Sequence, residues 1–334
     1  MKIFETLIFS TILIFSLNHL KAQEAAHSNL PVISYKDYGF KNIVKKAVSI
    51  YYLKDSLKIT ATMEQGYLFN DKGNITQKYI KILGKYASQT YTYYIYKNGL
   101  LDSIKTRASA KNFNNDVHFE YNKEGKIVKS HGIGYYTNYT DFFAYQNNKL
   151  VNSLRTYPNS NNKIECNYHY KHNILNYVEE INISKSNKKT TIDTTTYYYS
   201  KEKLFASYNS KGEKITFYDT PYGDLEKTIK KTTKSVILDS RKLYEENPEE
   251  FSRTIETKFV KSAQIVNKNY QETNAENDWI YMFEYNNAYG QKQKRYIFQE
   301  VVYPNDKVSG STKFDSFFEK RVKQKLAWIP QDLF

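Results

Sequence analysis

A short pattern of residues recurs along this chain at nearly even steps, and it constrains the fold more than any other feature. Each copy contains an aromatic residue, two or three polar residues, a Gly or Asn, and then an aliphatic residue. The aromatic residues of the clearest copies are 24 to 27 positions apart: Phe69, Tyr96, Tyr121, Tyr145 and Tyr170. Looser copies begin near Tyr199, Tyr208, Tyr218 and Tyr285. Such even steps indicate an internal structural repeat.

The pattern has the chemistry of a β-hairpin. Its Gly or Asn adopts the positive φ angle that a tight turn requires, and Asn98-Gly99 is the strongest short hairpin signal in the chain. The aromatic residue ends one strand and the aliphatic residue begins the next, so we expect the two to pack on the same face. The flanking residues alternate as strands do, with Val117, Phe119 and Tyr121 on one side.

These observations predict an all-β fold, a long twisted antiparallel meander of repeated β-hairpins that forms an open sheet, with a short C-terminal helix. We expect the repeat region over residues 23–235 and a connector over 236–252, where acidic residues surround Pro248. A C-terminal β region with a terminal helix is expected over 253–334.

The terminal helix is predicted from apolar residues at helical spacing, namely Phe314, Phe317, Phe318, Val322 and Leu326. Ser311 or Thr312 is the expected cap. We expect the helix to cover an exposed end of the sheet, because bare strand edges invite aggregation. A basic helix lying on a membrane surface is the alternative.

The signature Tyr-(Asp/Asn)-x-x-Gly-x-(Leu/Ile) resembles the YD repeat of RHS and teneurin-type proteins, and similar degenerate repeats of exported bacterial proteins. The resemblance extends from Tyr67 to Leu225, with a further copy near Tyr285. In that family the repeats form a sheet that spirals into a hollow shell around a toxin domain. This chain has about nine copies, too few to close such a shell, and it lacks the Asp-Pro-x-Gly motif that precedes a released toxin. The resemblance implies repeated hairpins and raises a short relative of toxin-shell proteins as one functional alternative.

The first residues have the order of a secretory signal peptide. Lys2 precedes an apolar run from Leu7 to Leu17, and Ala22 is the small residue before the expected cleavage ahead of Gln23. A retained single-pass anchor is the alternative, but the run is about half of the roughly 20 apolar residues that a span needs. We therefore expect residues 1–22 to be a signal peptide and the protein to be exported to the periplasm, the outer surface or the cell exterior.

After signal cleavage we expect no transmembrane span. No later segment is a long apolar run, and the predicted strands mix Tyr with Lys and Asn instead of carrying an apolar lipid-facing band. Cys166 is the single cysteine, so it forms no internal disulfide, and we interpret it as a buried small hydrophobic residue. The formal net charge of +14 favours anionic surfaces such as acidic polysaccharide, although it is also that of a solvated lysine-rich surface. No nucleic-acid partner is expected for an exported chain.

The chain carries no recognisable catalytic or cofactor motif. It has no Gly-x-Ser-x-Gly, no His-Glu-x-x-His and no Gly-Lys-Ser/Thr phosphate loop. His169 and His172 are three residues apart, a spacing that places strand side chains on opposite faces. We therefore predict no catalytic residue, no metal site and no cofactor, and we favour a non-enzymatic role.

Aromatic surface is the remaining functional signal. Tyrosine runs put rings on both faces of a strand, so where one face is core the other shows rings to solvent. Flat Tyr and Trp faces suit sugar rings and protein partners; the alternative is that Tyr serves only as a β-former. The candidate ligand-binding residues are Tyr93, Tyr135, Tyr136, Tyr139, Tyr197 and Trp279.

The leading hypothesis from sequence is thus an exported non-enzymatic β-repeat protein that binds envelope polysaccharide or a surface protein. The first alternative is a hydrolase that acts on an extracellular polymer with two carboxylates converging on a groove. The second is the short relative of toxin-shell proteins.

Overall fold

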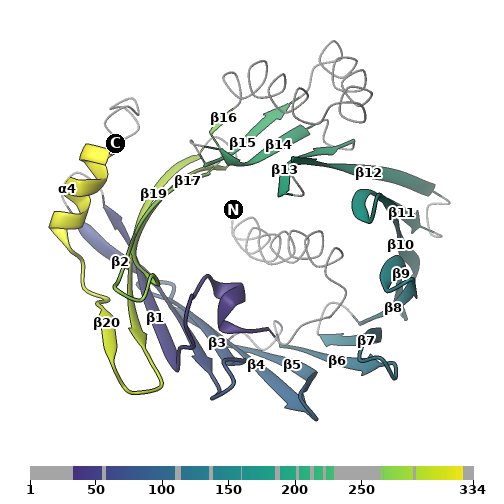
Figure 1. Ribbon diagram of the computed structural model, residues 1–334, viewed down its shortest axis with the longest axis horizontal. Coiled ribbons are helices and arrows are strands. Elements are labelled where there is room, and N and C mark those ends of the chain that lie inside the picture. Colours follow the sequence, from purple (N-terminus) through teal and green to yellow (C-terminus); the bar gives the residue numbers. More distant parts are fainter. Residues whose placement is uncertain are drawn as a thin grey trace. The chain divides into compact units, whose positions relative to one another are not determined.

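The structure is a computed structural model that describes residues 33–54, 58–109, 114–134, 138–158, 160–184, 189–200, 203–210, 214–220, 223–228, 264–265, 267–288 and 291–325. These residues are almost entirely β, their strands pair antiparallel, and α4 (Ser316–Lys325) is the one α-helix among them (Figure 1). The predicted all-β meander with a short C-terminal helix is confirmed. The predicted signal peptide and the predicted connector lie outside the described residues.

The chain divides into two compact units, and unit 1 contains His118–Gly132 and Thr137–Gly212. It is a succession of hairpins in which each strand from β7 to β13 pairs with the next. Its strands are the end of β6 (Asn115–Tyr121), β7 (Ile127–Gly134), β8 (Tyr139–Gln146), β9 (Lys149–Tyr157), β10 (Ser160–Lys171), β11 (Ile174–Ser184), β12 (Lys189–Ser200) and β13 (Lys203–Asn209).

Unit 2 contains Pro31–Val117, Ile133–Tyr136 and Glu213–Phe334. It joins two distant parts of the sequence, because β1 pairs with β2 on one side and with β19 on the other. Its elements are the 3-10 helix η1 (Tyr35–Tyr38), α4, and the strands β1 (Lys46–Lys54), β2 (Ile59–Phe69), β3 (Ile75–Ile82), β4 (Ser88–Lys97), β5 (Leu100–Ala108), β14 (Lys214–Thr220), β15 (Gly223–Thr228), β16 (Gln264–Ile265), β17 (Asn267–Thr273), β18 (Trp279–Ala288), β19 (Gln291–Val302) and β20 (Val308–Gly310).

The polar part of the repeat forms one of two turns. In the longer turn, Oδ1 of Asn70, Asn122 or Asn274 accepts hydrogen bonds of 2.9–3.0 Å from the backbone N–H groups two and four residues on. The residue three positions on has a positive φ, 77° at Gly73 and 76° at Gly125. The Asn side chain thus satisfies the turn's backbone donors, which explains the residue type at this position.

The shorter turn has two central residues with positive φ, as a type I′ hairpin requires. The three pairs are Asn98-Gly99 (φ 53° and 80°), Asn147-Asn148 (49° and 64°) and His172-Asn173 (48° and 68°). The hairpin predicted at Asn98-Gly99 is confirmed.

The aromatic and aliphatic residues of the repeat face each other across the hairpin, as predicted. These cross-strand partners are Phe69 with Ile75, Tyr96 with Leu101, Tyr145 with Leu150, and Tyr170 with Leu175. A register shift directly precedes each aromatic residue, as an extra residue in one strand beside the hairpin end produces. Ile75, Leu101 and Leu175 are fully or almost fully buried, which makes each hairpin end a small apolar cluster.

Lysine side chains connect successive hairpins of unit 1. Lys126 of one hairpin donates a hydrogen bond to Asn148 in the turn of the next, and its Nζ lies 5.5 Å from the ring centroid of Tyr145. Lys149 repeats the arrangement one hairpin on, with its Nζ 5.0 Å from the ring centroid of Tyr170. Cation–π contact and hydrogen bonding therefore add to the strand pairing between repeats.

Two apolar cores stabilise unit 2. In one, η1 and the segment after it pack Phe40 and Val44 against Phe69, Ile75 and Val301. In the other, α4 packs Phe318 and Val322 against Phe283, Tyr296 and Phe298 of β18 and β19. Burying such side chains supplies about 1.5–3 kcal/mol each.

Helix α4 differs in detail from the sequence expectation. It begins at Ser316, and Oδ1 of Asp315 accepts a 2.8 Å hydrogen bond from the N–H of Phe317, so Asp315 is the cap and not Ser311 or Thr312. The helix covers a face of the sheet and not its end. Phe317 points away from that face and is 67% exposed, while Arg321 pairs with Glu272 of β17 at 2.6 Å. Leu326 lies outside the described residues.

Candidate binding face

One face of the β2–β5 sheet in unit 2 carries a row of tyrosine rings. On β4, Tyr94 packs against the η1 core, so Tyr91 and Tyr93 point to the opposite face. Ring centroids lie 5.8 Å apart between Tyr79 of β3 and Tyr91, and 6.4 Å apart between Tyr91 and Tyr93. Tyr93 is 40% exposed. We call Tyr79, Tyr91 and Tyr93 the tyrosine row.

Strand register places polar and charged side chains around this row. One line of cross-strand neighbours runs through Gly66, Tyr79, Tyr91 and Arg107, and the next runs through Gln77, Tyr93 and Lys105. A third pairs Glu64 with Lys81. The tyrosine face is therefore defined by Glu64, Gly66, Gln77, Tyr79, Lys81, Tyr91, Tyr93, Lys105 and Arg107.

Gly66 determines how the first ring of the row lies. A Cβ atom built at Gly66 would be 2.2 Å from Cε1 of Tyr79 and 2.6 Å from its hydroxyl oxygen. Carbon atoms in ordinary contact are about 3.5–4.0 Å apart. The Tyr79 ring thus occupies the space of the missing side chain and lies against strand β2, an arrangement in which an aromatic ring shields a strand glycine.

Ion pairs border the row. Lys81 Nζ lies 2.9 Å from Glu64 Oε1 and 4.8 Å from the ring centroid of Tyr79. The hydrogen bond from Lys81 lowers the pKa of Glu64, with a further contribution from the Tyr79 hydroxyl. Arg107 pairs with Asp116 through both terminal nitrogens. The face therefore combines flat apolar area with hydrogen-bonding groups, which is the composition of a surface that binds sugars or proteins.

Unit 1 contains a second glycine–tyrosine contact. Gly132 lies opposite Tyr139 in register, and a Cβ atom at Gly132 would be 2.4 Å from the Tyr139 ring. The guanidinium of Arg155 lies 4.2 Å from the ring centroid and holds Asp141 through two hydrogen bonds of 2.7 and 3.0 Å. Ser130 donates a third bond to Asp141, which is 8% exposed. Burial raises the pKa of Tyr139. Here the ring is sandwiched between backbone and guanidinium.

Four of the six predicted ligand-binding residues are described by the structure, and they lie on different elements of the two units. Tyr93 lies on the tyrosine face of unit 2, whereas Tyr139 lies under Arg155 in unit 1. Tyr197 is half-buried on β12 opposite Ser207. Tyr135 and Tyr136 lie outside the described residues. Sequence reasoning missed Gly66 and Tyr79; the signal that could have found them is an isolated glycine inside a strand, which marks close approach of another group.

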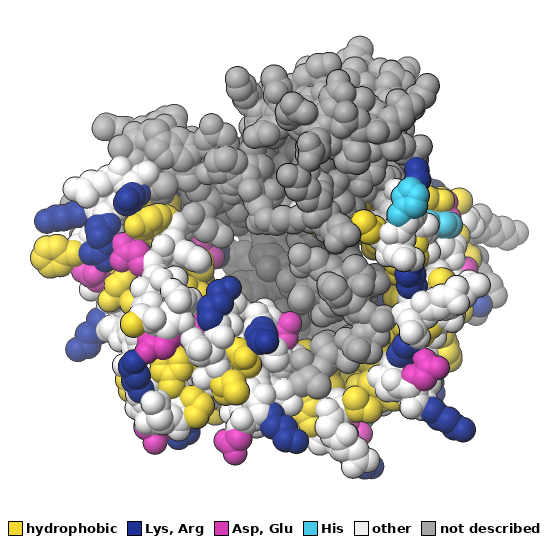
Figure 2. Space-filling model, viewed as in Figure 1, with side chains coloured by type: hydrophobic (Ala, Val, Ile, Leu, Met, Phe, Trp, Pro, Cys, Tyr) yellow, Lys and Arg dark blue, Asp and Glu magenta, His cyan; other side chains and the backbone are white. Residues whose placement is uncertain are grey.

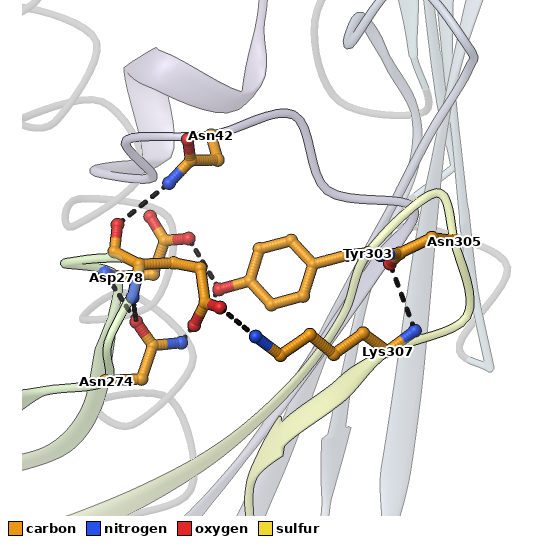
Figure 3. Close-up of polar contacts among 7 residues, drawn as sticks. Asn42, Asn274, Asp278, Tyr303, Asn305 and Lys307 are labelled. Carbon is orange, nitrogen blue, oxygen red and sulfur yellow. Dashed lines mark hydrogen bonds and ion pairs between the residues drawn. The ribbon is translucent and has the colours of Figure 1, made fainter.

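Trp279, the last of the six predicted residues, comes directly after Asp278 in the sequence. Asp278 belongs to a polar network that connects three loops of unit 2 (Figure 3). Asp278 is fully buried and accepts a hydrogen bond from the N–H of Lys41. It also accepts one, at 2.7 Å, from the hydroxyl of Tyr303 (Figure 3). Asn274 donates to the same hydroxyl at 2.7 Å. A Cβ atom at Gly39 would be 4.0 Å from the indole of Trp279. Trp279 is half-buried next to this network, and its carbonyl accepts a 2.7 Å hydrogen bond from Gln299 of β19.

Other chemistry-bearing groups are dispersed. His169 Nε2 lies 3.3 Å from Glu179 Oε2, and its ring stacks on Tyr177 with centroids 4.1 Å apart. Within the described ranges there is no group of three or more His, Cys, Asp or Glu residues placed to hold a metal ion. Cys166 is half-buried. In the same ranges no helix has the length and apolar character needed to cross a membrane. On the face shown in Figure 2, the described Lys and Arg side chains are interspersed with hydrophobic and acidic ones.

Comparison with known proteins gives little further. No family model matches the chain, and no curated protein does. Among solved structures, the chain is similar to a porin-like protein from Bacteroides uniformis, with 11% identity and a TM-score of 0.35 over 77% of this chain and 96% of that one. A likeness at this TM-score carries no argument about function.

Proposed function

We propose that this chain is an exported, non-enzymatic β-repeat protein that binds an envelope or extracellular partner, a polysaccharide or a surface protein, through the tyrosine face. The observation that carries the proposal is the row of three neighbouring rings, with Tyr93 40% exposed. A contiguous exposed apolar patch marks an interaction site, and tyrosine offers apolar surface with a polar edge at small entropic cost.

Capture from the envelope fraction tests the binding role. The mature protein is immobilised, and material retained at low and at high salt is compared with that retained by Tyr91→Ala/Tyr93→Ala. We expect the double variant to lose capture that resists high salt, since stacking on rings is little screened by ions. Phe317→Ala, which removes another exposed ring outside the tyrosine face, is the matched control and should retain capture. Equal capture by all three proteins would contradict the proposal.

Export is tested separately. Sequencing of the amino terminus of the protein from its own cells should begin at Gln23, because the small residue Ala22 precedes the expected cleavage. A product that still begins with Met1 would contradict cleavage.

A hydrolase is the second candidate, and one observation in unit 1 favours it. Asn152 donates 2.8 Å hydrogen bonds to Glu165 and to Asn167, and Asn167 lies opposite Glu179 of β11. Glu165 and Glu179 therefore lie on one face of neighbouring strands, and glycoside hydrolysis uses two carboxyl groups about 5–10 Å apart. Release of reducing ends from envelope polysaccharide, abolished by Glu165→Gln and by Glu179→Gln, would establish it. No release by the wild-type protein would end it.

A further inference from the structure

Every ring of the tyrosine row has a cation beside it. Lys81 Nζ lies 4.8 Å from the ring centroid of Tyr79. On β5, Arg107 is the cross-strand partner of Tyr91, and Lys105 is the cross-strand partner of Tyr93. Directly opposite residues of an antiparallel pair have Cβ atoms about 4.5–5.5 Å apart, so the strand register places one cation beside each ring.

The cations of the face outnumber its carboxylates. Glu64 pairs with Lys81, and Asp116 pairs with Arg107. Lys105 makes no ion pair within the described part of the chain. Arg107 is 44% exposed at its side chain, so part of its guanidinium still faces solvent. The charge of the face is therefore complementary to an anionic ligand, in line with the +14 balance of the whole chain.

The rings are ordered across the strands and along one of them. Tyr79 and Tyr91 lie on neighbouring strands, and Arg107 continues the same line to β5. Strands are about 4.8 Å apart, so a chain that crosses them meets a ring or a cation at each step. A linear polymer of ring-shaped units fits such a line better than a compact ligand does.

We propose that the tyrosine face binds a linear polysaccharide that carries carboxylates, with tyrosine rings stacking on sugar rings and with Lys81, Lys105 and Arg107 pairing with the carboxylates. The inference rests on the proposed function and names the chemical class of its partner.

Polygalacturonate is the probe, with a neutral glucan of similar length as its uncharged counterpart. Affinity of the mature protein for each is measured by titration calorimetry at 20, 150 and 500 mM NaCl. We expect saturable binding of polygalacturonate at 150 mM NaCl. The neutral glucan should bind more weakly by about tenfold or more, because it has no carboxylates to form charge-assisted hydrogen bonds with the lysine and arginine side chains.

Two variants separate the parts of the contact. Tyr91→Ala/Tyr93→Ala should weaken polygalacturonate binding by about tenfold at every salt concentration. Lys105→Gln should weaken it by about threefold at 20 mM NaCl and have no effect at 500 mM. Lys72→Gln removes an equal charge from the exposed β2–β3 turn outside the face, and it should bind as the wild type does.

The possible outcomes separate the acidic-polysaccharide ligand from the proposed binding function of the tyrosine face. Tyrosine-dependent binding of the neutral glucan at equal or higher affinity would overturn the acidic ligand and leave the binding role standing. Envelope capture that depends on the row, without any binding of polygalacturonate, would do the same. Equal weakening by Lys105→Gln and Lys72→Gln would show that net charge alone attracts the polymer, and would overturn the site.

Discussion

The glycine–tyrosine contacts of unit 1 and unit 2 have the same local arrangement but differ in what covers the outer side of the ring. In both, a strand glycine lies opposite a tyrosine whose ring fills the space of the missing side chain, at Gly132 with Tyr139 and at Gly66 with Tyr79. In unit 2, Glu64 pairs with Lys81, and the Lys81 ammonium group lies over the ring of Tyr79. In unit 1, Asp141 pairs with Arg155, and the Arg155 guanidinium lies over the ring of Tyr139.

The difference lies in what covers the outer side of the ring. In unit 1 the planar guanidinium of Arg155 lies over Tyr139 and is held by the buried Asp141. In unit 2 the cation is the flexible Lys81, its partner Glu64 is more exposed, and the ring continues into Tyr91 and Tyr93. The same local packing therefore serves stability in one unit and leaves an aromatic face in the other.

Removing the acidic partner should have the largest effect, and only in unit 1. Asp141→Ala removes a carboxylate whose side chain is 11% exposed and leaves Arg155 and Ser130 without their partner, which should lower the free energy of unfolding by about 3 kcal/mol. Glu64→Ala should lower it by less than about 1 kcal/mol, because the pair is partly solvated. Urea unfolding followed by tyrosine fluorescence measures both. Equal losses of unfolding free energy in the two variants would contradict the comparison. Asp141→Asn retains an acceptor for Ser130, so its loss should lie between that of Asp141→Ala and that of Glu64→Ala.

Replacing the strand glycine by alanine should have the next largest effect on the free energy of unfolding. Gly132→Ala places a methyl group against a ring that Arg155 holds from the other side, at an expected cost of about 2 kcal/mol. Gly66→Ala should cost about 1 kcal/mol, since Tyr79 can swing outward past the Lys81 side chain. Adding Tyr139→Ala to Gly132→Ala should cost less than the sum of the two single changes. Additivity would show that the two residues do not interact.

The pH dependence of the unit 2 pair should be the smallest effect. The pKa of Glu64 is lowered in the folded state, first by its hydrogen bond from Lys81. The ionised pair therefore stabilises the fold above the unfolded-state pKa, and this contribution is lost as pH falls through the folded-state value. Between pH 7 and about 3, the wild type should lose a few tenths of a kcal/mol (~0.3) more than Glu64→Gln. An identical pH profile for the two would mean that the pair contributes nothing.

The hairpins were predictable because their chemistry is local. Asn98-Gly99 has positive φ at both residues, as the type I′ turn that this residue pair favours requires, and the aromatic and aliphatic residues flank that turn. The resemblance to YD repeats, the signal peptide and the domain limits remain predictions.

The sequence could not predict which distant strands pair, or which side chains lie opposite one another across them. The pairing of β1 with β19 joins segments about 250 residues apart, and no local pattern specifies it. Tyr93 was found because its strand is crowded with tyrosines, whereas Tyr79 lies in an ordinary-looking strand and becomes notable only when Gly66 is opposite it. For the same reason Tyr139 looked like an exposed ring, because nothing nearby in sequence announces Arg155.

The most direct test compares Tyr79→Ala with Tyr139→Ala, each measured for its free energy of unfolding and for capture of envelope material. We predict that Tyr79→Ala retains most of the stability and loses much of the salt-resistant capture. We predict that Tyr139→Ala loses stability and, where it stays folded, captures as the wild type does. Loss of capture by Tyr139→Ala alone, with Tyr79→Ala unaffected, would contradict the assignment of the binding face to unit 2.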